Sequence, residues 1–224
     1  LRREKKDVLK KLPSMRKIIE EVELSDAQRR NYEALKRDAQ NLSPEQRISL
    51  VTKLAIATCE TINGENAKIK KAADIILKAQ ENSEKVLVFS NYNAVLHQAK
   101  HAFQQNGIGS IIFTGELDQQ GRQRALNAFK KNDQLSAILM NAKVGAEGLT
   151  LTEANNVIFL NEWWNPSSNR QAEDRVNRIG QSQDIVVHVI RALKTIDIEI
   201  AKVIDGKQNL EQTFMEELTN RIVA

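Results

Sequence analysis

Two arginines and a glutamine lie close together in QAEDRVNRIGQ, the segment that covers residues 171–181. Gln171, Arg175 and Arg178 are spaced by four and three residues, so a helix over this segment would place all three on one face. Gly180 would end that helix. Two guanidinium groups on one helix face, near the carboxyl end of a strand, can donate a fork of hydrogen bonds to a phosphoryl group during its transfer.

The same arginines also have a simpler interpretation. Arg175 and Arg178 could pair with Glu173 and Asp174 on an ordinary solvent-exposed face. None of the nine glycines fits the phosphate-binding pattern G-x-x-x-x-G-K-[ST], and no predicted strand ends in an Asp-Glu pair that could hold magnesium. The chain by itself therefore has donors for a phosphoryl group but no cradle for the phosphates of a nucleotide.

The elements that must position these residues alternate between strand and helix from residue 85 onward. Five apolar runs are predicted strands, at residues 86–90, 110–113, 137–140, 156–160 and 185–190. Three helices are predicted between them, at about 93–106, 118–131 and 168–179. This alternation predicts a parallel sheet covered by helices on both faces, in which the loops after the carboxyl ends of the strands bind ligands.

The first 80 residues are predicted to be mostly helical, after a short edge strand. Ser25 with Gln28, and Ser43 with Gln46, form capping-box patterns that begin two helices. The predicted helices cover about 26–40, 44–61 and 65–80, and further helices are expected in the tail at about 195–223.

Composition narrows the classes of protein that remain. Hydrophobic residues make up 41% of the 224 residues, but no apolar run approaches the roughly 18 residues needed to cross a bilayer, so we expect no membrane partner. One cysteine and three histidines offer no disulfide and no cysteine-rich zinc site, so we expect an intracellular protein with no metal site of its own. Leu1 in place of an initiating methionine leads us to expect a fragment of a longer protein.

The net charge of +4 is spread unevenly along the chain. Residues 1–20 contain eight basic and three acidic residues, a net charge of +5, which leaves −1 for the remaining 204 residues. Bulk charge therefore does not mark the body of the chain as a nucleic-acid binder. The basic arm either contacts phosphates or is a solvated helix end.

Several segments together resemble the Swi/Snf family of superfamily-two DNA-stimulated ATPases. VGAEGLTLTEAN (144–155) is similar to the family's motif V, WWNP (163–166) follows it at the expected distance, and QAEDRVNRIGQ is similar to motif VI. VLVFSNY (86–92) is similar to motif IV. After it, three residues match the family pattern, namely Gly115, Arg122 and Phe129.

The resemblance extends over nearly the whole chain. Residues 1–35 are similar to the stretch after motif III, which connects the first lobe to the second in this family. Residues 195–210 are similar to the family's carboxyl-terminal brace. Asn161 and Glu162 depart from the family, in which an acidic residue and a proline or arginine more commonly precede the tryptophans. We assign these two residues no role.

The resemblance implies a RecA-like α/β fold, in which helices sandwich a parallel sheet, with a mostly helical N-terminal extension and C-terminal helices. It divides the chain into four parts. These are a basic arm and edge strand from the inter-lobe junction (1–24), a helical family-specific region (25–80), the RecA-like second helicase lobe with motifs IV to VI (81–194) and C-terminal brace helices (195–224).

The resemblance also implies a nucleotide site between two lobes. ATP and Mg²⁺ would be held by an N-terminal RecA-like lobe outside this chain, and Arg175 and Arg178 would reach the nucleotide as catalytic arginine fingers. The other residues on the nucleotide side would be Gln171, Gly145, Glu147 and Gly148. The residues expected to bind DNA are Ser90, Asn91, Thr114, Gly115, Lys143, Thr150, Trp163 and Trp164.

The implied function is that of the C-terminal helicase lobe of an ATP-dependent double-stranded DNA translocase. Such a lobe would be an inactive part of an ATP hydrolase until joined to its first lobe, and it would work in the nucleus of a eukaryote or the cytoplasm of a prokaryote. One alternative is a non-catalytic α/β interaction or regulatory module, against which the intact arginines argue. Another is a lobe of a strand-separating helicase, against which WWNP and RIGQ argue.

Overall fold

A computed structural model describes residues 13–37, 42–141, 151–163, 166–178 and 180–205 of the chain. Its elements, in chain order, are β1 (Met15–Val22), α2 (Asp26–Arg37), α3 (Pro44–Ala57), α4 (Ala67–Glu81), β2 (Lys85–Ser90), α5 (Asn93–Gln105), β3 (Ser110–Phe113), α6 (Gln119–Lys131), β4 (Ala137–Asn141), β5 (Ala154–Phe159), α7 (Pro166–Glu173), β6 (Ile185–Ala192) and α8 (Ile196–Asp205). Within these residues the strand and helix order predicted from the sequence is confirmed, and the part of the predicted tail helices beyond Asp205 lies outside them.

The six strands form one sheet in the order β1-β6-β5-β2-β4-β3. Every neighbouring pair in this sheet is parallel. The predicted edge strand, β1, pairs with β6 over its full length, from Met15 opposite Ile185 to Val22 opposite Ala192. The predicted parallel α/β architecture is therefore confirmed, with the amino-terminal strand as one edge of the sheet.

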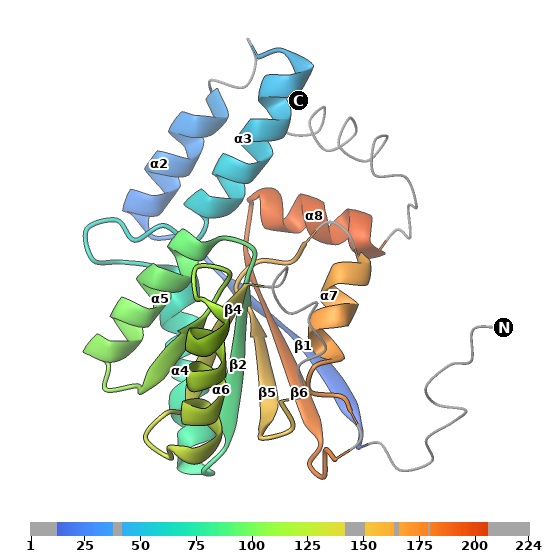
Figure 1. Ribbon diagram of the computed structural model, residues 1–224. Coiled ribbons are helices and arrows are strands. Elements are labelled where there is room, and N and C mark those ends of the chain that lie inside the picture. The colour runs from blue at the N-terminus through green and yellow to red at the C-terminus, as the bar shows by residue number, and fades with distance from the viewer. Residues whose placement is uncertain (1–12, 38–41, 142–150, 164–165, 179, 206–224) are drawn as a thin grey trace, which may run out of the picture.

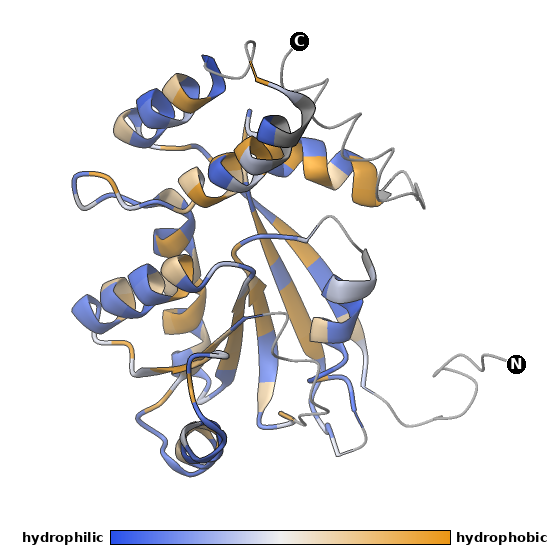
Figure 2. Ribbon diagram, turned by 45° about the horizontal axis from the view of Figure 1, so that its top comes forward, coloured by the Kyte–Doolittle hydropathy of each residue, from blue (hydrophilic) through white to orange (hydrophobic). Residues whose placement is uncertain are grey.

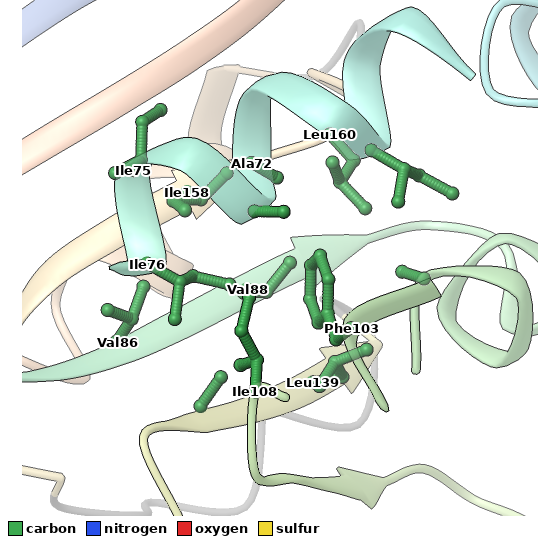
Figure 3. Close-up of a cluster of buried hydrophobic side chains, with 14 of the residues drawn as sticks. Ala72, Ile75, Ile76, Val86, Val88, Phe103, Ile108, Leu139, Ile158 and Leu160 are labelled. Carbon is green, nitrogen blue, oxygen red and sulfur yellow. The ribbon is translucent and has the colours of Figure 1, made fainter. Parts of the chain in front are cut away.

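Helices cover both faces of the sheet (Figure 1). Alternate residues of a strand point to opposite faces, so in β2 Val86 and Val88 pack with α4 and α5, while Leu87 and Phe89 pack with α6 and α7. Figure 2 shows the apolar residues concentrated on the strands and on the helix sides that face them. Figure 3 shows one of these two layers, in which Ile76 of α4 and Phe103 of α5 lie over Val88.

A third cluster of apolar side chains lies beyond the carboxyl ends of the strands. It joins α2, α3 and α8, which extend above the sheet in Figure 1, and contains Tyr32, Leu54, Ala192 and Ile200 among others. The two predicted capping boxes begin the helices of this region: the Ser25 and Ser43 hydroxyls accept from the backbone amides of Gln28 and Gln46. The helical extension therefore packs against the carboxyl end of the sheet.

One predicted helix end in this region was placed too late. The helix predicted to reach residue 61 ends at Ala57, because the chain turns through Cys59 and Glu60 and then forms a tight turn closed by hydrogen bonds between Ile62 and Glu65. Asn63 and Gly64 have positive φ angles of 53° and 79° in this turn, which a helix does not allow.

No helix within the described residues has the length and apolar character that crossing a membrane requires.

Candidate functional site

The arginine-bearing segment is helical over less of its length than predicted. The helix predicted for 168–179 is α7, which ends at Glu173, and residues 174–178 form turns and a bend. Beyond Glu173 the amides of Arg175 and Val176 bond to carbonyls three residues back rather than four, and the carbonyl of Arg175 accepts a hydrogen bond at 3.2 Å from the amide of Leu151, which lies far upstream in the chain. Gln171, Arg175 and Arg178 therefore do not share a helix face. Gln171 is exposed, whereas Arg175 is buried.

The arginines also lie at the other end of the strand from the one predicted. α7 begins beyond the carboxyl end of β5 and runs back along the sheet, so that Arg175 reaches Leu151, which precedes β5 (Figure 1). The side chain of Gln181 fastens this arrangement, donating a hydrogen bond at 2.8 Å to the carbonyl of Ala154, the first residue of β5. The arginine turn thus lies next to the last residues of motif V, where the chain enters β5.

Arg175 is the described residue whose surroundings best suit a ligand contact. It is 6% exposed, and its Nε atom has no hydrogen-bond partner among the described residues. Burial, followed by the positive charge of Arg178, lowers the pKa of Arg175 below its ordinary value. A buried guanidinium donor without an acceptor costs free energy unless an anionic group completes its bonding.

Arg178 lies in the same turn, and a backbone carbonyl of that turn holds its side chain. It is half-buried, and its Nε donates to the carbonyl of Asp174 at 3.2 Å. This bond fixes the guanidinium close enough to Arg175 to influence its pKa. Gln181, the last residue of the motif, is 7% exposed and also accepts hydrogen bonds from the amides of Ser182 and Gln183. In the sequence, membership of the motif was the only sign that Gln181 makes these backbone contacts.

The structure brings together the predicted DNA-binding loops after β2 and β3. Asn141, at the end of β4, donates to the carbonyl of Asn91 at 3.2 Å and to the side chain of Asn93 at 2.7 Å. Asn93 in turn donates at 2.9 Å to Glu116, which follows Thr114 and Gly115. The carboxyl ends of three neighbouring strands are therefore joined by side-chain hydrogen bonds.

The predicted DNA contacts differ in how well they are exposed. Gly115 is exposed and Asn91 is partly exposed, so both can meet a ligand. Ser90 and Thr114 are fully buried, and the Ser90 hydroxyl donates to Asn161 at 2.8 Å. Both side chains are buried in this conformation, and the Thr114 hydroxyl donates to Glu116 at 3.4 Å, so a DNA contact by either side chain stays a prediction without a geometric argument behind it.

The aromatic turn is closed by an asparagine that the sequence analysis did not single out. Asn169 accepts from the amide of Trp163 at 2.9 Å and donates to the carbonyl of Trp163 at 2.7 Å. Trp163 is thus held at the start of α7 with its side chain partly exposed. Six of the predicted site residues lie outside the described residues, namely Lys143, Gly145, Glu147, Gly148, Thr150 and Trp164.

Asn161 and Glu162, which received no role from the sequence, hold the carboxyl end of β5 in place. Asn161 is 3% exposed and donates to the carbonyl of Ala55 on α3 at 3.2 Å. The buried carboxylate of Glu162 binds Lys17 of β1 at 2.9 Å and Arg191 of β6 at 2.7 Å. The partners of Asn161 and Glu162 lie more than 25 residues away in the sequence, so no local sequence pattern indicated these contacts.

Metal binding finds no support in the described part of the chain, where no three histidine, cysteine, aspartate or glutamate side chains are grouped to hold an ion. The donor set at Arg175 and Arg178 instead suits an anionic group such as a nucleotide phosphate. These residues do not provide a site for Mg²⁺.

Comparison with known proteins identifies the family. The sequence matches the helicase conserved C-terminal domain over residues 67–180, or 114 of the 224 residues. The chain belongs to the helicase C-terminal domain family. An uncharacterized ATP-dependent helicase of Mycoplasma genitalium, MG018, is 32% identical over 97% of this chain, and the match spans only 22% of that relative.

Solved structures agree with this family at the level of the fold. The C-terminal part of the Fun30 ATPase domain has a TM-score of 0.84 at 18% identity, and the match covers 95% of the present chain and 98% of the Fun30 chain. A Sulfolobus solfataricus SWI2/SNF2 ATPase core in complex with double-stranded DNA has a TM-score of 0.75 at 22% identity, and the match covers 94% of the present chain and 47% of the Sulfolobus chain. The resemblance to the Swi/Snf family and its RecA-like fold is therefore confirmed.

Proposed function

We propose that this chain is the second RecA-like lobe of an ATP-dependent double-stranded DNA translocase. The observation that carries the proposal is the buried Arg175, whose Nε lacks a partner among the described residues, in a motif inside the matched helicase C-terminal domain. The relative from Mycoplasma genitalium is called an ATP-dependent helicase, and the Sulfolobus structure contains double-stranded DNA. These names support ATP as the substrate and duplex DNA as the partner.

In the proposed reaction, Arg175 and Arg178 act as arginine fingers. Negative charge spreads over the γ-phosphoryl oxygens of ATP in the transition state, and fixed guanidinium donors stabilise that charge without having to reorganise. The hydrogen bond from Arg178 to Asp174 and the burial of Arg175 limit the side-chain motion that such a contact would otherwise have to freeze. A finger of this kind contributes about 10³- to 10⁵-fold in rate.

The first lobe is required because the second lacks a phosphate cradle in its sequence. We propose that the first lobe binds the phosphates and Mg²⁺, and that the isolated chain does not turn over ATP. Changes in the gap between the two lobes during the ATP cycle would move the duplex along the loops after β2, β3 and β4. Because DNA and ATP are intracellular, the proposed site of action is the nucleus of a eukaryote or the cytoplasm of a prokaryote.

The test is ATP turnover by a longer protein that restores the upstream lobe, measured with and without duplex DNA. Arg175→Ala and Arg178→Ala are compared with Arg30→Ala, because Arg30 is an exposed arginine on α2, away from the motif. We expect DNA to stimulate turnover, and each motif substitution to lower kcat about 10³-fold or more while ATP still binds. Arg30→Ala should retain the wild-type rate.

Two outcomes would contradict the proposal. Turnover by the isolated chain would show that the first lobe is not required. Turnover of the longer protein that ignores both DNA and the motif substitutions would leave a non-catalytic interaction module as the better interpretation.

A further inference from the structure

One charged pair lies among the loops proposed to carry DNA and has no part in the reaction. Glu116 follows Gly115 after β3, and its carboxylate lies 2.9 Å from Nε2 of His97 on α5. Asn93 donates to the other carboxylate oxygen at 2.9 Å, and Asn93 is itself bound by Asn141 at 2.7 Å. The pair is therefore fixed to the ends of three strands.

The position of this carboxylate is unfavourable for binding a polyanion. The side chain of Glu116 is 53% exposed and next to Gly115, which is proposed to approach a DNA phosphate. An unneutralised carboxylate there repels phosphate by Coulomb's law, and salt screens the repulsion only in part over such a short distance. Within the described residues, the one ion-pair partner of Glu116 is His97, whose side chain is 55% exposed.

We propose that His97 and Glu116 form a proton-dependent switch in the DNA track. When His97 is neutral, the pair carries a net charge of −1 beside the phosphates. When His97 is protonated, the pair is neutral and the duplex binds more tightly. This inference rests on the proposed binding of DNA by the same loops.

The surrounding groups do not change the charge of this pair, so its charge depends on His97. Hydrogen bonds from His97 and then Asn93 lower the pKa of Glu116, so the carboxylate stays ionised. The other charged side chains on the packed elements point to different partners: Asp118 accepts from the amide of Gly121, and Arg122 donates to the carbonyl of Leu117. On α5, His101 bonds to Gln105, and Lys100 is exposed.

The experiment measures binding of a short fluorescein-labelled DNA duplex to the two-lobe protein without nucleotide, at constant ionic strength, from about pH 8 to about pH 6. Glu116→Gln removes the carboxylate but keeps an acceptor for Asn93. His97→Gln removes the imidazole. His101→Gln is the matched control, since His101 is exposed on the same helix and bonds to Gln105, with no carboxylate partner among the residues that the structure describes.

We expect the wild type and His101→Gln to bind about three- to tenfold more tightly at the lower pH, beyond any tightening seen for Glu116→Gln. Glu116→Gln should bind tightly across the range, and His97→Gln weakly across it. If the wild type binds DNA but all four proteins share one pH dependence, the switch is refuted and the proposed DNA binding stands. If the wild type binds no duplex at either pH, both proposals fail.

Discussion

The ammonium group of Lys68 lies 2.7 Å from a carboxylate oxygen of Asp197, and both residues are buried. This pair joins α4 to the start of α8, at the carboxyl end of β6, where the same carboxylate oxygen also accepts from the amide of Ala192 at 2.9 Å. Burial is the largest influence and would lower the pKa of Lys68, but the negative charge of Asp197, followed by Cys59 and by the hydrogen bonds to both, together raise it. The helical extension is thus attached to the sheet by an ion pair as well as by apolar packing.

Removing the lysine from this pair should be costly. Lys68→Met leaves the charge of Asp197 buried without a cation, so we expect the free energy of unfolding to fall by about 3 to 5 kcal/mol, measured by urea denaturation. Asp197→Asn in the same protein should recover part of this loss, since the amide oxygen can still accept from Ala192. The control is Lys70→Met on the exposed side of α4, and equal losses for both single variants would refute the buried pair.

The single cysteine, Cys59, should be unreactive in the folded protein. It is fully buried, its thiol donates to the carbonyl of Leu160 at 3.6 Å, and burial raises its pKa above the ordinary value. Because the thiolate is the nucleophile, we expect maleimide to label Cys59 at least about 100-fold more slowly in buffer than in denaturant. Gln104→Cys, which adds a thiol at an exposed position on α5, should label rapidly in the same buffer. Similar labelling rates for the two thiols would contradict the burial.

A second histidine makes stability depend on pH. His188 Nδ1 lies 3.1 Å from Glu20, whose other oxygen binds Lys71 at 2.8 Å. Burial lowers the pKa of His188 despite the carboxylate. The unfolded chain therefore takes up the proton first, and stability is lost as the pH falls below about 6.5 towards the lower pKa of the folded state.

The measurement is the free energy of unfolding at about pH 7.5 and about pH 5.5. We expect His188→Gln to lose less stability on acidification than the wild type, and the exposed His101→Gln to lose as much as the wild type. Hydrogen bonds from Lys71 and His188 lower the pKa of Glu20, so its own contribution is lost only below about pH 4.5, outside this window. A wild type that becomes more stable on acidification would show that the charge of Glu20, rather than burial, determines the direction of the pKa shift of His188.

Local patterns were enough to predict the elements of the sheet. Continuous apolar runs such as residues 137–140 have the composition of strands buried on both faces, and the capping boxes at Ser25 and Ser43 are visible in four consecutive letters. The motif match also selected Arg175 and Arg178 without any knowledge of their surroundings. These patterns give information about residues that are neighbours within one helical turn or one strand.

The geometry of the site depends on distant neighbours, and there the sequence was insufficient. α7 ends at Glu173 and the chain continues in turns whose Arg175 carbonyl binds the amide of Leu151, so counting helical spacing beyond Glu173 placed Gln171 and Arg175 on a face that does not exist. Ser90 illustrates the same limit, because its inward orientation depends on Asn161. Contacts of this range follow from the strand order, which single-sequence patterns do not give.

The buried carboxylate of Glu162 provides the last test, because it joins three strands. It follows β5, binds Lys17 of β1 and accepts from Nε of Arg191 of β6 at 2.9 Å. Glu162→Gln removes the negative charge between two cations, so we expect the free energy of unfolding to fall by about 2 to 3 kcal/mol. Glu21→Gln, at an exposed position of β1, should change it by less than about 0.5 kcal/mol.

The two cations should not contribute equally to this effect. The side chain of Lys17 is 41% exposed and that of Arg191 only 12%, so solvent screens the lysine more strongly. We therefore expect Arg191→Met to cost more stability than Lys17→Met in the same urea titrations. If Lys17→Met proved the more damaging, the edge strand rather than the buried arginine would be the main partner of Glu162, and the attachment of β1 to the sheet would depend on this one ion pair.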